Sequence, residues 1–471
     1  MVEMMIIFAL ILIVCIVTSK ALYKFGVPIL LIFMVLGMLF GTDGIGKIAF
    51  SNYNMAQELC SLGLLFIMFY GGFCTNWSIA KPVAFRSVLM STVGVIITAG
   101  FTGTFCYYIM ETSLLEGLLI GSVVASTDAA SVFAILRSQK LNLKGSLASI
   151  LEVESGSNDP FAYLCTIVIL TLMNNGGIET IIPVLIKQIV FGLVVGFVLA
   201  KGTVYFLRRA NFDIDGFYPI FLIAIAILSF YFSEWIGGNG YLSVYLSGII
   251  LGNNKIPHKK SLIHFFDGIS WIMQIMLFFM LGLLAFPSRL PSVFLTGIAI
   301  SIFLIVVARP VATFSILSFF KVPIKEQVFI SWVGLRGAAS IVFAIFAVNY
   351  DVAVNSDIFH IIFFVALFSV AVQGTLLPKV AKILDLVDDK STVFKTFNDY
   401  KGEDNAKLIE VPVDKSSKWA NKTIMDAGIP EEILIVMIKR NGMVIVPKGS
   451  ILILPGDILV LGGNDLSSLL A

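Results

Sequence analysis

Charged side chains are scarce in this sequence: only 13% of its 471 residues are Asp, Glu, Lys or Arg, whereas 58% are hydrophobic. The mean hydropathy is +0.96, and a soluble domain carries about 25% charged residues. This composition excludes an ordinary soluble domain and predicts a polytopic α-helical membrane protein. The formal net charge of +2 gives no basis for a nucleic-acid partner.

The residues on which catalysis and metal binding usually depend are also few. The three histidines show no metal-ligand spacing, and the five cysteines lie within apolar runs without a Cys-x-x-Cys pair. We therefore interpret the cysteines as small core residues. No catalytic triad and no phosphate-binding glycine loop can be found, so the sequence predicts neither an enzyme nor a resident metal or cofactor.

What the chain has instead is a series of about thirteen apolar runs, each a candidate membrane span. They cover residues 4–22, 27–41, 55–73, 85–110, 114–137, 145–173, 180–207, 216–236, 238–253, 265–285, 292–316, 325–349 and 358–378. The first run follows an acidic start and precedes Lys20 and Lys24. This is the reverse of a secretory signal, so we expect a first transmembrane helix.

The connections between these runs alternate in charge. Basic pairs or clusters occupy every second one, at Lys20/Lys24, Lys81/Arg86, Arg137/Lys140/Lys144, Arg208/Arg209, Lys255/Lys259/Lys260, Lys321/Lys325 and Lys379/Lys382. Because basic loops stay in the cytoplasm, this alternation predicts a cell-membrane protein with its N-terminus outside and its C-terminus inside.

Two of the runs resemble each other. Asp128–Ile135 in the fifth run is similar to Gly337–Ile345 in the twelfth, and both are preceded by residues that interrupt an apolar helix. Seven spans separate them, so their directions through the membrane are opposite. Such pairs are typical of inverted repeats whose broken helices cross at a binding site near the membrane midplane.

A polar stretch, Glu152–Pro160, interrupts the sixth run. Asp159 lies roughly 21 Å along a helix that begins at Gly145, which places it within the bilayer. Glu154 and Asn158 are four residues apart, as are Ser155 and Asp159, so their oxygen atoms share one helical face. Oxygen ligands on a buried face suit a small hard cation or a proton.

Two simpler interpretations exist for this stretch. The acids could be structural, each held by one Arg or Lys, and Gly-Ser-Asn-Asp-Pro is also a common turn sequence. The apolar flanks Ser149–Leu151 and Phe161–Leu172 argue against a soluble turn.

The composition changes after Leu384. We expect a transport domain over residues 1–384, a charged linker over 385–405 and a small cytoplasmic α+β domain over 406–471. Strand-like runs at 408–413, 433–439, 443–446 and 458–461 are separated by turn signals at Asn441-Gly442 and Pro455-Gly456-Asp457. A domain of this size has a small core, so dimerisation would help it.

These residues together resemble a known family. Ser126-Thr127-Asp128 and Glu154-Ser155-x-x-Asn158-Asp159, with Val307–Pro310 and Gly334–Ala338, resemble the signatures of the monovalent cation:proton antiporters, in their sodium/proton-exchanger-like asparagine–aspartate branch. The tail resembles the C-terminal half of regulator-of-potassium-conductance (TrkA-C) domains. The sequence departs from many relatives at Ala129, where they carry proline.

The resemblance implies a role for each site residue. Asp159 would be the carboxylate for which cation and proton compete, and Ser155 and the Thr127 carbonyl would complete an oxygen cage. Asp128 would lie at the helix break, and Asn158 would stabilise the site. The supporting charges would be Arg309, as the partner of Glu154, and Arg336 at the second break; Arg336 could also simply extend toward a membrane surface.

The expected function is therefore exchange of a monovalent cation, K⁺ rather than Na⁺, for H⁺ by alternating access. One titrating acid would make the exchange electroneutral, and the activity would serve pH homeostasis. The resemblance of the tail also implies that the protein forms a homodimer and that a small anionic ligand regulates it. A cyclic dinucleotide is one candidate for this ligand. The alternatives are a ligand-gated potassium channel, for which no Thr-Val-Gly-Tyr-Gly-like filter is present, and an ion-sensing membrane protein without transport.

Overall fold

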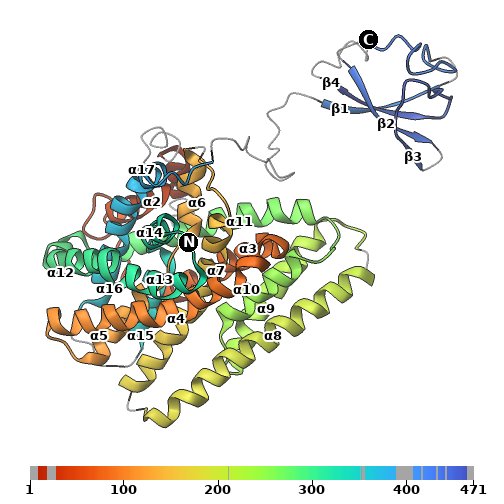
Figure 1. The fold of residues 1–471 in the computed structure, drawn as a ribbon. Coiled ribbons are helices and arrows are strands. Elements are labelled where there is room, and N and C mark those ends of the chain that lie inside the picture. The colour runs from red at the N-terminus through yellow and green to blue at the C-terminus, as the bar shows by residue number, and fades with distance from the viewer. Residues whose placement is uncertain are drawn as a thin grey trace. The chain divides into compact units, whose positions relative to one another are not determined.

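The computed structural model describes residues 9–18, 28–139, 141–174, 176–209, 212–350, 352, 356–388, 407–414, 417–430, 433–440 and 443–463. The chain divides into two compact units, residues 1–391 and 392–471. The first is helical and the second is built on a β-sheet (Figure 1). Each is described by itself.

After a short helix over Ala9–Thr18, the helices of the first unit follow in a regular series. They are α2 (Ile29–Phe40), α3 (Tyr53–Cys74), α4 (Trp77–Met110), α5 (Leu114–Val124), α6 (Ala129–Ser138), α7 (Leu147–Met173), α8 (Ile181–Arg209), α9 (Phe217–Trp235), α10 (Gly240–Gly252), α11 (Lys259–Leu284), α12 (Leu290–Phe303), α13 (Arg309–Leu317), α14 (Ile324–Trp332), α15 (Ala338–Asn349), α16 (Ile358–Phe368) and α17 (Thr375–Ile383).

Within the described residues, eight helical segments are long and apolar enough to cross a membrane by length and composition. Four shorter apolar helices and the more polar α7 occupy the remaining predicted runs. All thirteen predicted runs thus contain helix, and the prediction of a polytopic helical membrane protein is confirmed. The boundaries differ most at α4 and α11, which begin at Trp77 and Lys259, well before the apolar residues that marked them.

Four of the spans are irregular. The fifth consists of α5 and α6 with a break between them, and the twelfth of α14 and α15 with a second break, as the sequence predicted. The eleventh contains a π-helical turn at Leu304–Ala308, and the thirteenth contains another at Ser369–Gly374. The sequence did not indicate these two π-helical turns.

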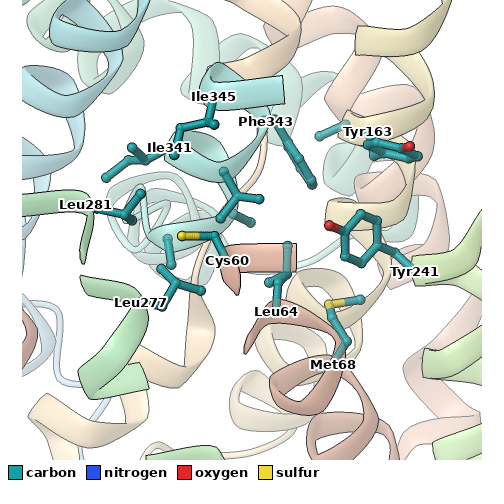
Figure 2. Close-up of a cluster of buried hydrophobic side chains, with 14 of the residues drawn as sticks. Cys60, Leu64, Met68, Tyr163, Tyr241, Leu277, Leu281, Ile341, Phe343 and Ile345 are labelled. Atoms are coloured by element: carbon teal, nitrogen blue, oxygen red, sulfur yellow. The ribbon is translucent and has the colours of Figure 1, made fainter. Parts of the chain in front are cut away.

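The helices pack in two groups. One group is built on α4, which contacts α5, α7 and α13, and the other on α3 and α11, with α2, α8, α9 and α10 around them. Between the groups lies an apolar core, in which Cys60 and Leu64 of α3 face Leu277 of α11 and Phe343 of α15 (Figure 2). The broken twelfth span is therefore held directly against α3.

The ninth span, α10, has only thirteen residues. It lies very close to α3: a Cβ atom at Gly248 would be 2.5 Å from the Phe69 carbonyl oxygen, and one at Gly252 would be 2.0 Å from that of Phe73. Glycine is thus required for this contact. Asparagines join both ends of α10 to neighbouring segments: the Asn239 amide donates to the Pro160 carbonyl at 2.8 Å, and the Asn253 amide donates to the Thr75 carbonyl at 2.8 Å.

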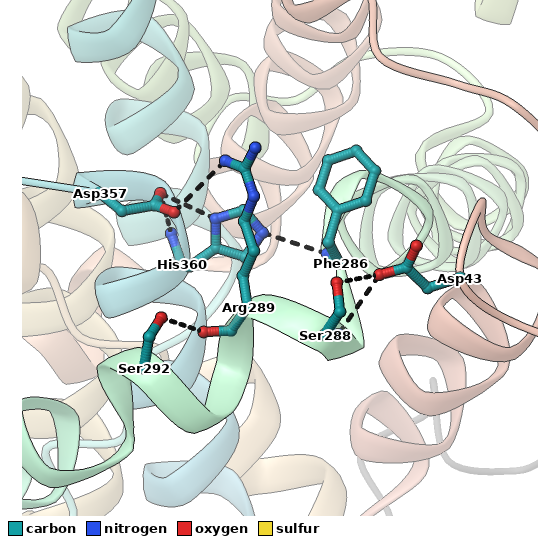
Figure 3. Close-up of polar contacts among 7 residues, drawn as sticks. All are labelled: Asp43, Phe286, Ser288, Arg289, Ser292, Asp357 and His360. Atoms are coloured by element: carbon teal, nitrogen blue, oxygen red, sulfur yellow. Dashed lines mark hydrogen bonds and ion pairs between the residues drawn. The ribbon is translucent and has the colours of Figure 1, made fainter.

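A polar cluster connects three loops near the ends of α2, α11 and α16 (Figure 3). The buried His360 ring accepts the backbone N–H of Phe286 at its Nε2 (3.1 Å), so its proton lies on Nδ1, 2.7 Å from Asp357. Burial acts to raise the pKa of Asp357, but the hydrogen bonds with His360 and the charge of Arg289 outweigh it and lower that pKa. Asp43 accepts the hydroxyl of Ser288 in the same connection.

The second unit contains a four-stranded antiparallel sheet in the order β1-β4-β2-β3. Its strands are β1 (Lys407–Pro412), β2 (Ile433–Arg440), β3 (Met443–Ile445) and β4 (Ile458–Gly463), close to the predicted ranges. Gly456 has a φ of +96° in the predicted Pro455–Asp457 turn, whereas the predicted Asn441-Gly442 turn lies outside the described residues. The guanidinium of Arg440 binds Asp457 through two hydrogen bonds, of 2.7 and 2.8 Å.

Two expectations need correction. Cys74 is exposed at the end of α3, so it is not a core residue, whereas Cys15, Cys60 and Cys106 are buried. The helical part of the expected α+β tail is not found among its described residues, which form strands, turns and loops. Amphipathic spacing cannot locate a helix in a segment this short.

Candidate ion-binding site

The polar stretch of the sixth span is continuous helix in α7, and it faces the interior of the unit. The side chains of Glu154 and Asn158 are buried, and Asp159 is only 9% exposed. Three of the four predicted polar residues, Ser155, Asn158 and Asp159, contact the break of the fifth span, whereas Glu154 contacts α13. The interpretation of this stretch as a soluble turn is excluded by its helical structure.

The break of the fifth span is held by the α7 face. The Ser155 hydroxyl donates to the Thr127 carbonyl (2.9 Å) and accepts the backbone N–H of Ala129 (2.8 Å). The Asn158 amide donates to the Thr127 hydroxyl. Ser155 and Asn158 thus replace the hydrogen bonds that the interrupted helix cannot make.

Asp128 is the N-cap of α6, where it accepts the Ser131 backbone N–H at 3.0 Å and the Ser131 hydroxyl. This position suits a carboxylate, because the first turn of a helix presents unpaired N–H groups and a partial positive charge. The helix begins at Ala129, whose backbone N–H donates to the Ser155 hydroxyl, a bond that a proline at this position could not make.

Asp159 accepts the hydroxyl of Ser126 and lines a small pocket. Thr127 and Asp128 line the same pocket, together with Gln274 of α11 and Ala338 of α15. Among the described residues Asp159 has no ion-pair partner, although it lies inside the protein. A buried carboxylate without a fixed positive charge is able to exchange a proton for another cation.

Glu154 is placed differently from Asp159. It forms an ion pair with Arg309 of α13, in which both side chains are less than 5% exposed. Since this charge is already compensated, Glu154 belongs to the support of the site, and it is not among the residues that line the Asp159 pocket.

The two breaks contact each other directly. The Asp128 backbone N–H donates to the Leu335 carbonyl at 2.8 Å. The Arg336 guanidinium donates to the Ser126 carbonyl at 2.9 Å, while its own backbone N–H donates to the Ser369 hydroxyl at 3.0 Å. Arg336 is 2% exposed. Its charge therefore lies at the C-terminal end of α5, across the crossing, and not at a membrane surface.

Sequence reasoning did not assign two residues near Asp159. Ser126, which binds Asp159, was recognised only as part of a motif, and Gln274 was not considered. The signal for Gln274 was available: it is an amide within the otherwise apolar segment Ile272–Leu284.

The chain was compared with known families and structures. The sequence profile described as "Sodium/hydrogen exchanger, transmembrane" matches residues 7–383. The chain belongs to this family. A TrkA-C domain profile matches residues 408–465 of this exchanger-family protein.

Similar family members carry names of potassium exchangers. The K(+)/H(+) antiporter NhaP of Alkalimonas amylolytica is 36% identical over 375 residues, which cover 79% of this chain and 65% of that protein. The K(+)/H(+) antiporter NhaP2 of Shewanella oneidensis is 32% identical over 450 residues, which cover 94% of this chain and 78% of that protein. The matched region thus spans less than two thirds of the first relative's length.

A solved structure shows the same fold. The sodium proton antiporter MjNhaP1 from Methanocaldococcus jannaschii superposes with a TM-score of 0.70 at 24% identity, covering 82% of this chain and 98% of that chain. The likeness supports the helical arrangement of this exchanger-family chain.

Proposed function

We propose that this protein is a secondary active antiporter that exchanges a monovalent cation for H⁺, with Asp159 as the shared carboxylate. The observation that carries this proposal is the contrast between two of the acids on α7. Glu154 is neutralised by Arg309, whereas Asp159 has no ion-pair partner among the described residues and faces a pocket beside two helix breaks. Of these two acids, Asp159 is thus the one that is free to alternate between a proton and a cation.

The oxygen atoms around Asp159 define what can bind. The Ser126 hydroxyl, the Thr127 carbonyl and the Ser155 hydroxyl lie at the break, and Asn158 holds the Thr127 side chain. Hydroxyl and carbonyl oxygens suit an alkali cation. K⁺ is favoured over Na⁺ because the two relatives described above are named K⁺/H⁺ antiporters. Na⁺ is the alternative, because MjNhaP1 is named a sodium proton antiporter.

The organisation of the chain follows from this assignment. Residues 1–384 would perform transport in the cell membrane, and residues 406–471, after the linker, would form a cytoplasmic regulatory domain. The alternation of basic loops supports this orientation. The proposed partners are membrane lipid, for which α8 exposes a row of apolar side chains, and a second copy of the chain. The TrkA-C match supports an anionic ligand such as a cyclic dinucleotide as the regulator.

The experiment is cation-dependent proton flux in proteoliposomes that carry an internal pH indicator. K⁺, Na⁺ and an impermeant organic cation are added in turn to wild-type protein and to Asp159→Asn. We expect rapid pH change with K⁺ in the wild type and none in the variant, because an amide cannot alternate between charged and protonated forms. Asp215→Asn is the matched control, since Asp215 lies in an exposed loop beside His258, and it should behave as the wild type.

Other outcomes distinguish the alternatives. Potassium flux without proton movement would indicate a channel, and binding without flux would indicate an ion sensor. Full exchange by Asp159→Asn would overturn the assignment of the carboxylate.

A further inference from the structure

A second cavity lies beside the crossing, between α12, the thirteenth span and the break of the twelfth. Arg309, Arg336, Ser301, Ser369 and Gln373 provide its polar lining. Among the described residues it shares no lining residue with the pocket of Asp159. The cavity is therefore a separate site, with room for one ligand of about the size of a water molecule.

Its lining carries an excess of positive charge. Arg309 and Arg336 are 3% and 2% exposed, and their like charges repel each other. Glu154 compensates one of them through the Nη2 of Arg309. The Nε of Arg309 is buried without a hydrogen-bond partner, and within the described residues Arg336 forms no ion pair.

The neutral groups of the lining have their own partners within the protein. The Ser369 hydroxyl donates to the side-chain oxygen of Gln373 (2.6 Å). The side-chain NH₂ of Gln373 donates in turn to the Trp332 carbonyl (2.8 Å). The Ser301 hydroxyl donates to the Gly297 carbonyl of its own helix at 2.7 Å. The unsatisfied hydrogen-bonding group of this cavity is thus a donor, and the charged side chains that line it are both arginines.

Both helices that flank the cavity depart from α-helical geometry at this point. The π-helical turn Leu304–Ala308 directly precedes Arg309, and the turn Ser369–Gly374 contains both Ser369 and Gln373. Turns of this kind are frequent at functional sites, since they re-aim side chains that a regular helix would turn away.

We propose that this cavity binds one small monovalent anion, chloride in the first instance, between the guanidinium groups of Arg309 and Arg336. A water molecule would fill the space but would leave two buried guanidinium groups beside the cavity with one ion-pair partner, Glu154, among the described residues, which is unfavourable. A monatomic anion accepts hydrogen bonds from both arginines and balances the charge. The bound anion would stabilise the contact between the twelfth and thirteenth spans.

The test is the thermal unfolding of the purified full-length protein in potassium gluconate, with chloride or bromide titrated in at constant K⁺ and pH. A ligand that binds only the folded state raises its stability in a saturable manner, so we expect Tm to rise by about 2–4 °C to a plateau. Ser301→Leu should abolish this rise, because the larger side chain fills the cavity while both arginines remain. Thr92→Leu is the control, since Thr92 is a half-buried residue of α4, outside the cavity, whose hydroxyl also bonds its own helix.

A direct measurement keeps the proposal testable if Ser301→Leu does not fold. Crystals of the wild type grown with bromide should show an anomalous peak between Arg309 and Arg336. Equal Tm values in gluconate and chloride, together with the absence of that peak, would overturn the proposal and assign the cavity to water. A Tm rise that persists in Ser301→Leu would likewise place any anion effect elsewhere.

Discussion

The backbone N–H of Asp128 donates to the carbonyl oxygen of Leu335 at 2.8 Å, and this bond joins the break of the fifth span to that of the twelfth. A second bond joins the same breaks, because Arg336 donates to the Ser126 carbonyl after α5. Ser126, which donates to the carboxylate of Asp159, thus lies in a break that is held by segments more than two hundred residues away in the sequence.

The first prediction concerns the space at this crossing. A Cβ atom at Gly337 would lie 2.3 Å from the Asp128 Oδ2, so Gly337→Ala must displace the cap of α6. We expect exchange to fall about tenfold or more, because small displacements of a binding constellation have large effects, while the protein still inserts. Gly100→Ala in α4 is the control, since no atom lies within 4 Å of its added methyl group. Equal flux in the two variants would contradict the packing argument.

The second prediction concerns the pair of Glu154 and Arg309. Replacing either partner alone leaves a buried charge, which typically costs about 3–5 kcal/mol, so Glu154→Gln and Arg309→Met should each be strongly destabilising. The double variant should lose less unfolding free energy than the two single variants lose together. A double-mutant cycle of unfolding free energies measures this difference. The exposed pair Lys144 and Asp385 should give a cycle near additivity. Additivity at Glu154–Arg309 as well would argue against their coupling.

The third prediction addresses electroneutrality. The Asn158 amide donates to the Thr127 hydroxyl, and its Oδ1 is buried without a partner. Asn158→Asp adds a second acid beside Asp159, so a second proton can be carried and exchange should respond to an imposed membrane potential, worth about 2.3 kcal/mol per charge per 100 mV. Wild type and Asn254→Asp, which changes a loop residue in the same way, should not respond. Voltage-independent exchange in all three would count against a single-acid stoichiometry.

The fourth prediction concerns the regulatory domain. A ligand changes transport only by binding one state better than another. Truncation after Asp389 should therefore retain cation-dependent proton flux but lose the response to cytoplasmic pH or nucleotide. The measurement is flux against pH for both forms, with and without cyclic dinucleotides. Superimposable curves would identify the domain as an assembly module.

The fifth prediction uses the ion pair of that domain. The hydrogen bond from Arg440 lowers the pKa of Asp457 below its ordinary value of 3.8, although burial opposes the shift. A carboxyl group whose pKa is lower in the folded state stabilises the fold at pH values above its ordinary pKa. This stabilisation is lost as the pH falls through the lower pKa of the folded state. The protection factors of β2 and β4 amides in the full chain should therefore fall as the pH drops below the ordinary value of 3.8 in the wild type. Asp457→Asn should exchange faster already at neutral pH with less acid dependence, whereas Asp414→Asn, at an exposed position, should match the wild type.

The spans and the polar face of α7 could be predicted from sequence because both depend on local spacing. Hydropathy marked every span, and the i, i+4 relation of Ser155 and Asp159 required only helical geometry. The matching interruptions of the fifth and twelfth spans were visible because apolar helices rarely tolerate such residues.

What the sequence could not provide was the set of long-range contacts. Nothing local to Arg336 indicates that its guanidinium reaches the Ser126 carbonyl, and nothing local to Gln274 places it beside Asp159. The π-helical turns were also hidden: Leu304–Ala308 is as apolar as the flanking helix, and the Ser and Gln of Ser369–Gly374 do not distinguish a π-helical turn from an α-helical one. Such features arise from packing between segments and not from propensity.

The shortness of α10 determines what must surround it. A helix of thirteen residues is about 20 Å long, whereas the hydrocarbon core measures about 30 Å. Non-helical backbone at either end of such a crossing cannot be solvated by hydrocarbon. Asn239 and Asn253 provide hydrogen-bond partners there. Every residue of α10 is buried or half-buried, and α3, α7, α8 and α9 pack around it, so protein rather than lipid encloses this crossing, which is too short to span the bilayer as a helix by itself.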